Sequence, residues 1–152
     1  MSSVIKKFIY WLFNSSDNSI LANLLIKYRE KVRYLKVCNV NDAHFLMDVE
    51  SAKTVFHANT VATKEPHTIE WIDKYFSKGD VFYDIGANVG VFSLYVAAKY
   101  DSDIKVISFE PEALNYAQLN RNVYNNNFQD IITTYGIAIS DKTEFRTMEN
   151  WW

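Results

Sequence analysis

VFYDIGANVG, residues 81–90, places two glycines directly after a short run of strand-forming residues. The run 81–85 is nearly continuous in apolar residues, which is typical of a parallel strand that is covered on both faces. Glycines after such a strand allow a tight turn and the close approach of a ligand. The helix that follows offers free N–H groups and the positive end of its dipole. The stretch therefore predicts a strand, a turn and a helix, with a binding site at the turn.

The alternation of strands and helices continues through residues 64–152. Apolar residues at helical spacing predict a helix over 91–100, and a second strand follows at 105–109. A helix over about 112–124 then leads to a third strand at 131–135. Alternation of this kind favours right-handed βαβ units in a parallel sheet. The fold class is therefore predicted to be α/β, with a partial Rossmann-like domain beginning at residue 64.

Residues 1–63 are expected to form a separate N-terminal region. A helical leader in two pieces comes first, and short alternating stretches such as 36–38 and 44–48 then predict antiparallel strands. Glu65-Pro66 opens a helix that ends near Gly79, because proline is tolerated in the first helical turn and glycine often follows the last one. The predicted boundary between the two regions lies between residues 63 and 64.

The overall charge of the chain is close to neutral. There are 16 Lys and Arg residues against 18 Asp and Glu residues, so the net charge is −2. This balance gives no electrostatic case for nucleic acid, and we expect no nucleic-acid partner. The charge is unevenly distributed, however, since residues 1–36 hold seven basic and two acidic side chains. A basic leader therefore precedes an acidic domain.

The start of the leader has an amphipathic pattern. Four apolar residues fall at i, i+3, i+4 and i+7 beside two lysines: Ile5, Phe8, Ile9 and Leu12, with Lys6 and Lys7. Such a stripe is usually buried against the protein's own core, and this interpretation is favoured. Weak peripheral contact of residues 1–13 with a membrane surface is the alternative.

Other classes of protein are excluded by what the sequence lacks. Cys38 is the only cysteine, so no intrachain disulfide can form. His44, His57 and His67 have no ligand spacing among them, and no metal site is indicated. The longest apolar run, 8–13, has six residues, whereas a membrane-spanning helix needs about 20. We therefore expect a cytoplasmic protein.

A carboxylate at the end of the second strand indicates a nucleoside cofactor. Glu110 stands 24 positions after Gly86, and a carboxylate can accept from both hydroxyls of a ribose. An NAD site would show Gly-x-Gly-x-x-Gly, whereas this chain has Gly86-x-x-x-Gly90. Asp84 would repel a pyrophosphate but suits S-adenosylmethionine (SAM), whose sulfonium and amino groups are positive. The alternative is that the glycines only permit close packing and that Glu110 is a solvated loop residue.

Three stretches together resemble a known family. Residues 81–90, then Phe109-Glu110-Pro111, then Ala138-Ile139-Ser140-Asp141 resemble the successive motifs of FkbM-type SAM-dependent methyltransferases. The resemblance implies a class I methyltransferase fold with SAM as the methyl donor. It also implies O-methylation of a hydroxyl, commonly on a sugar or another small metabolite.

The resemblance also implies roles for individual residues. The cofactor-binding residues would be Asp84, Gly86, Ala87, Asn88, Gly90, Glu110, Pro111 and Ala138. The residues before Glu110 would line the methionine part of SAM, Glu110 would bind the ribose, and Pro111 and the backbone near Ala138 would contact the adenine. Asn88 stands where a third glycine is common, and asparagine accepts a left-handed conformation with little strain. No catalytic residue is assigned.

The end of the chain departs from the family pattern. A class I sheet continues beyond its third strand, whereas residues 142–152 show no further strand and helix. We therefore expect a methyltransferase fragment that is inactive alone and whose strand 81–85 forms a sheet edge open to self-association. The alternative is a non-catalytic nucleoside-binding or interaction module that pairs with another chain.

Overall fold

A computed structural model describes residues 3–14, 23, 27, 34–101 and 103–144 of the chain. They belong to two compact units, Met1–Tyr34 and Leu35–Trp152. The division falls after Tyr34, not after residue 63, because the antiparallel strands pack in the same unit as the parallel sheet.

The first unit contains the helix α1, Ser3–Asn14. This confirms the first helical piece expected in the leader. Apart from residues 23 and 27, the second piece lies outside the described residues, as do the side chains of the apolar stripe, so membrane contact stays a prediction. None of the described helices is long and apolar enough to cross a membrane.

The second unit begins with an antiparallel hairpin. Strands β1, Leu35–Val40, and β2, Ala43–Asp48, pair with Leu35 opposite Asp48 and Val40 opposite Ala43. Alternate side chains of both strands are buried on one face: Cys38, Val40, Ala43, Phe45 and Met47. The antiparallel strands predicted for this region are confirmed.

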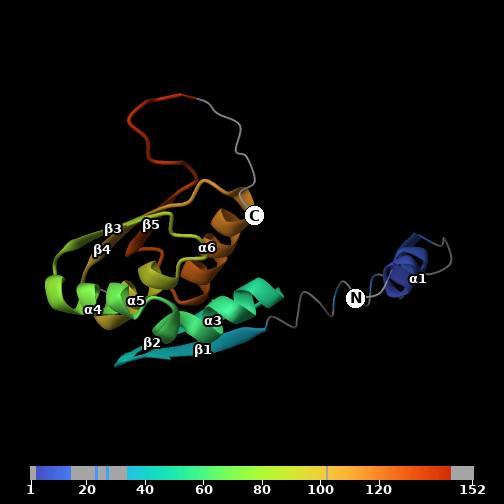
Figure 1. Cartoon of the computed structure of the whole chain (residues 1–152), viewed down its shortest axis with the longest axis horizontal. Coiled ribbons are helices and arrows are strands. Elements are labelled where there is room, and N and C mark those ends of the chain that lie inside the picture. Colours follow the sequence, from blue (N-terminus) through green and yellow to red (C-terminus); the bar gives the residue numbers. More distant parts are fainter. Residues whose placement is uncertain (1–2, 15–22, 24–26, 28–33, 102, 145–152) are drawn as a thin grey trace. The chain divides into compact units, whose positions relative to one another are not determined.

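The parallel sheet has three strands in the order β3-β4-β5. They span Val81–Ile85, Lys105–Phe109 and Ile132–Tyr135, and the helices α5, Val91–Lys99, and α6, Ala113–Asn125, connect them. Both helices lie between this sheet and the hairpin (Figure 1). The predicted α/β fold, with β3 at one edge of the sheet, is confirmed.

One expectation for the parallel sheet is wrong. Strand β3 was expected to be covered on both faces, but only Phe82 and Asp84 are buried, while Val81, Tyr83 and Ile85 are 42%, 59% and 64% exposed. The reason is that α5 and α6 pack on the same face of the sheet. Within the described residues, the opposite face of β3 has no covering layer.

A helix that sequence analysis missed, α3, spans Ala52–Lys64. The Ser51 hydroxyl accepts from the N–H of Thr54, and the Thr54 hydroxyl accepts from the N–H of Ser51, which forms a capping box. Short strands were expected between residues 34 and 63 because of alternating stretches such as 44–48, and no helix was predicted for this segment. The buried side chains of α3, Thr54, Ala58 and Val61, instead follow a helical spacing.

Helix α4, Pro66–Tyr75, follows α3 directly and agrees with the helix expected after Glu65-Pro66. Proline stands at its start, and Ile69 and Ile72 are its buried residues. The two helices together bring the chain from the hairpin to the first strand of the parallel sheet.

Amide side chains of α6 and of its C-cap residue, Asn126, hydrogen-bond the free edge of β2. Asn126 accepts from the Leu46 N–H (2.7 Å) and donates to the Leu46 carbonyl (2.8 Å). Asn122 accepts from the Asp48 N–H (2.8 Å), and Gln118 donates to the Asp48 carbonyl (3.0 Å). We call Gln118, Asn122 and Asn126 the amide ladder. It satisfies backbone groups that a neighbouring strand would otherwise pair.

We expect Asn122→Ala to lower the free energy of unfolding by about 2–4 kcal/mol, because it leaves buried backbone groups of Asp48 and Val89 without partners. Asn120→Ala, on the exposed side of the same helix, should cost less than about 1 kcal/mol. Urea denaturation of both variants measures the difference. Equal losses would contradict a special role for Asn122.

A second polar cluster joins α4, α5 and the turn of the hairpin. Lys99 lies 2.7 Å from Asp73, the buried Tyr95 donates its hydroxyl to Asp73, and Asn41 donates to Asp73 over 2.9 Å. Burial alone would raise the pKa of Asp73, but the hydrogen bonds from Lys99, Tyr95 and Asn41 together hold it below its ordinary value. Burial, reinforced by Asp73, raises the pKa of Tyr95 to about 12.

This cluster should make stability depend on pH. Because the pKa of Asp73 is lower in the folded state, its contribution is present above the unfolded value of about 3.9 and is lost as the pH falls through the folded value. Asp73→Asn should therefore have a lower melting temperature than the wild type at pH 7, and this difference in melting temperature should narrow below about pH 4. A gap that stays constant from pH 7 to pH 3 would show that Asp73 contributes nothing through its charge.

Candidate functional site

The loop between β3 and α5 is fixed to the end of the neighbouring strand. The N–H groups of Gly86 and Ala87 both donate to the Phe109 carbonyl, each over 2.9 Å. Gly86, Asn88 and Gly90 have φ angles of +80°, +51° and +88°. The structure therefore places Asn88 in the left-handed conformation expected from the sequence.

The two glycines of the loop have different surroundings. A Cβ on Gly90 would meet Leu119 Cδ1 at 2.5 Å, so this glycine permits close packing of α5 against α6. A Cβ on Gly86 would meet nothing within 4 Å. The packing interpretation therefore holds for Gly90, whereas Gly86 leaves its backbone open to a ligand.

Asp84 is a buried carboxylate at the end of β3. It is 7% exposed, and its Oδ2 accepts from both the backbone N–H and the hydroxyl of Ser93. The Ser93 hydroxyl also lies 2.7 Å from that of Ser108. Burial raises the pKa of Asp84, the Ser93 hydrogen bonds oppose this in part, and the charge of Glu110 adds to the rise. A cation beside Asp84 would compensate its burial and favour the ionised form.

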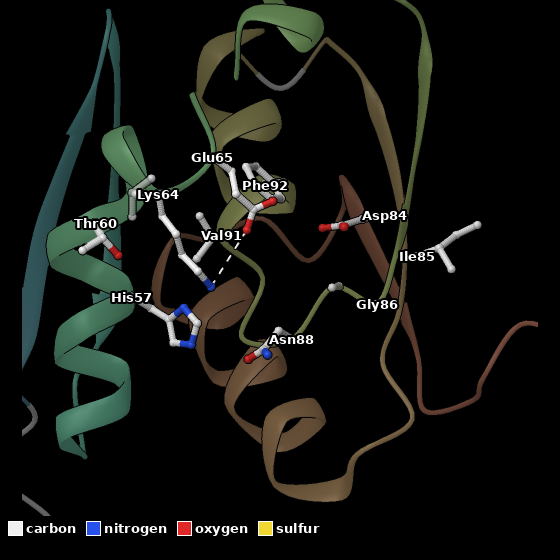
Figure 2. Close-up of a pocket in the computed structure, with 12 residues that line it drawn as sticks. His57, Thr60, Lys64, Glu65, Asp84, Ile85, Gly86, Asn88, Val91 and Phe92 are labelled. Carbon is white, nitrogen blue, oxygen red and sulfur yellow. Dashed lines mark ion pairs between the residues drawn. The ribbon is translucent and has the colours of Figure 1, made fainter. Parts of the chain in front are cut away.

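A pocket with a volume of about 260 Å³ lies between α3 and this loop (Figure 2). It is lined by His57, Thr60, Val61, Lys64, Glu65, Asp84, Ile85, Gly86, Ala87, Asn88, Val91 and Phe92. Its volume is below the range of about 300–1,000 Å³ that is usual for sites that enclose a whole ligand. The pocket therefore suits one end of a longer molecule.

The structure brings together four of the eight predicted cofactor-binding residues: Asp84, Gly86, Ala87 and Asn88 all line the pocket. The other four lie outside its lining. Gly90 is at the start of α5, Pro111 is half-buried beyond the end of β4, and Ala138 is exposed beyond the end of β5. Whether these residues contact a cofactor stays a prediction.

Glu110 is neither solvated nor part of the pocket lining. It is 5% exposed, and its two oxygens accept from the N–H of Asn88 (2.7 Å) and of Glu112 (2.9 Å). The alternative of a solvated loop residue is therefore wrong. In this structure Glu110 hydrogen-bonds the loop from outside the pocket. Its contact with a ribose stays a prediction.

Sequence analysis missed the wall of the pocket that α3 supplies. His57 and Lys64 are seven residues apart and so share one face of a helix. The signal that could have revealed them is the capping box, Ser51 with Thr54, because it marks the start of a helix in a stretch whose composition favours strands.

No family model matches the chain, and no curated protein matches it. Several solved structures are similar to it at a low level. The hMettl16 catalytic domain in complex with the MAT2A 3′UTR hairpin 1 is 17% identical, with a TM-score of 0.46 over 76% of this chain and 46% of that one. TYW2 of P. horikoshii in complex with MeSAdo is 21% identical, with a TM-score of 0.42 over 70% and 37%.

A third similar structure is the tRNA m1G37 methyltransferase of M. jannaschii, which is 20% identical, with a TM-score of 0.40 over 68% of this chain and 30% of that one. The chain thus spans less than half of the length of each of these proteins. Likeness at this level concerns the arrangement of strands and helices, and it leaves ligand and substrate open. The FkbM resemblance is a hypothesis that rests on the motifs alone.

The exclusion of nucleic acid was wrong. One of these similar structures holds an RNA hairpin, and another is named for its action on tRNA. The net charge of the chain could not support the exclusion, because it averages over the basic residues 1–36 and the acidic remainder. Charge therefore gives no ground for ruling RNA out.

The two glycines should respond differently to substitution. Gly90→Ala combines a left-handed backbone with a clash against Leu119, so we expect it to lower the free energy of unfolding by about 3 kcal/mol or more. Gly86→Ala adds only the backbone strain, about 1–2 kcal/mol. Urea denaturation compares them, and a Gly90→Ala variant as stable as Gly86→Ala would refute the packing role.

Proposed function

We propose that this chain binds SAM and forms the donor-binding part of a methyltransferase. The observation that carries the proposal is the buried carboxylate of Asp84 beneath the left-handed loop at the end of β3. A pyrophosphate at this position would meet a buried negative charge, whereas the positive groups of SAM would meet an opposite one. The proposal therefore favours SAM over a dinucleotide.

The size and position of the pocket indicate which end of SAM it would hold. At about 260 Å³ it takes the methionine end of SAM, while the nucleoside would extend along the ends of β4 and β5. Catalysis would then come mainly from holding the methyl group in line with an acceptor. No residue is assigned as the base that removes a proton from the acceptor.

The acceptor is a more specific part of the proposal. The FkbM resemblance implies a hydroxyl on a sugar or another small metabolite, and this rests only on residues 81–90, 109–111 and 138–141. The sequence motifs are therefore the whole support for the acceptor class. A labelled-methyl assay with sugar, small-metabolite and RNA acceptors tests two expectations: no transfer agrees with a chain that is inactive alone, and transfer to one acceptor identifies the acceptor class.

Calorimetry tests the donor. We expect SAM to bind more tightly than NAD, and Asp84→Asn to weaken SAM binding by about tenfold or more, because hydrogen-bonded charge pairs contribute about 1.5–3 kcal/mol. Asp80→Asn is the matched control, since Asp80 is exposed just before β3, at the end far from the pocket, and should leave SAM binding unchanged. Tighter binding of NAD, or equal effects of the two variants, would overturn the proposal.

A further inference from the structure

The pocket carries opposite charges on its two sides. From α3, His57 and Lys64 reach toward the loop, with Glu65 beside Lys64, while the Asp84 carboxylate lies across the same space (Figure 2). Two nitrogen-bearing side chains therefore face the pocket together with two acids. A ligand that bears both a positive and a negative group would match this arrangement.

Lys64 is held only weakly where it stands. An ion pair joins it to its chain neighbour Glu65 over 3.9 Å, and the two side chains are 48% and 49% exposed. An ion pair this long and this exposed contributes little, so an incoming carboxylate can replace Glu65. The Lys64 ammonium is therefore available to an anionic group in the pocket.

His57 can contribute a hydrogen bond beside Lys64. Burial lowers the pKa of His57, and the charges of Lys64 and Lys53 lower it further. The ring is then neutral at neutral pH but keeps one N–H donor. Thr60, between them on α3, already donates its hydroxyl to the Phe56 carbonyl over 2.8 Å. His57 and Lys64 are thus the donors that α3 offers to the pocket.

Asn88 supplies an independent observation on the opposite side. Its Oδ1 is buried and accepts no hydrogen bond from the part of the chain that the structure describes. Buried acceptors of this kind normally have a partner, and a donor from a ligand would provide one. Asn88 and Asp84 both line the pocket, and the residues of β3 and the loop that line it include no lysine, arginine or histidine. A positively charged group of a ligand could therefore donate to both.

We propose that α3 forms a carboxylate-binding wall, in which Lys64 and His57 hold the α-carboxylate of an amino-acid group whose ammonium faces Asp84 and Asn88. The inference rests on the proposed function and extends it, because it assigns the amino-acid end of the donor to a helix outside the glycine loop. The volume of about 260 Å³ agrees with one amino-acid end, not with a whole cofactor.

The test compares two ligands that differ only in this group. S-adenosylhomocysteine carries the amino-acid end, and 5′-methylthioadenosine lacks it. With the full 152-residue chain, we expect Lys64→Gln to weaken S-adenosylhomocysteine binding about fivefold and His57→Ala about threefold, while 5′-methylthioadenosine stays within twofold of the wild type. Lys64→Arg keeps the charge and should keep most of the affinity.

Lys74→Gln is the matched control, because Lys74 is an exposed lysine of the next helix, α4, and does not line the pocket. It should change the affinity for either ligand by less than twofold. If Lys64→Gln has no larger effect than Lys74→Gln, or weakens both ligands equally, the carboxylate-binding wall is wrong while the SAM proposal stands. If the wild type binds neither ligand, both proposals fall.

Discussion

One buried amide, Asn122, connects the parts of the molecule on which the site depends. Its side chain is fully buried, accepts from the Asp48 N–H and donates to the Val89 carbonyl, each over 2.8 Å. It thereby ties the hairpin and the loop after β3 to the same turn of α6. An apolar side chain could fill the space but would leave backbone groups unpaired. The placement of α3, which follows the hairpin, depends on this connection.

The site is organised before any ligand arrives, because its buried acids already have fixed partners. Glu110 accepts from the backbone of Asn88, and Asp84 accepts twice from Ser93. Of the left-handed residues of the loop, Asn88 is held by Glu110, and Gly86 by the Phe109 carbonyl. Rigid polar groups of this kind need little reorganisation when a charged ligand enters. The charge of Asp84, which lines the pocket, can therefore act on the ligand directly.

The sequence was sufficient to predict secondary structure where local patterns agree with tertiary packing. The strands and helices from β3 to β5 follow their hydrophobic periodicity, and the conformation of Asn88 follows from its position between two glycines. Helix α3 could not be predicted from composition, because its β-branched residues favour strands and only the capping box and contacts with the hairpin make it helical. The role of Glu110 could not be predicted either, because the N–H groups of Asn88 and Glu112 reach its carboxylate only in the folded chain.

The two walls of the pocket belong to segments that only α4 connects along the chain. A molecule held by both walls would add its own binding free energy to the attachment of the hairpin and α3, by RT ln(1 + [L]/Kd). Local opening of the hairpin would then become rarer as the pocket fills. Hydrogen exchange at the amides of β1 and β2, which touch no ligand, would thus report the occupancy of a site on the other side of α3.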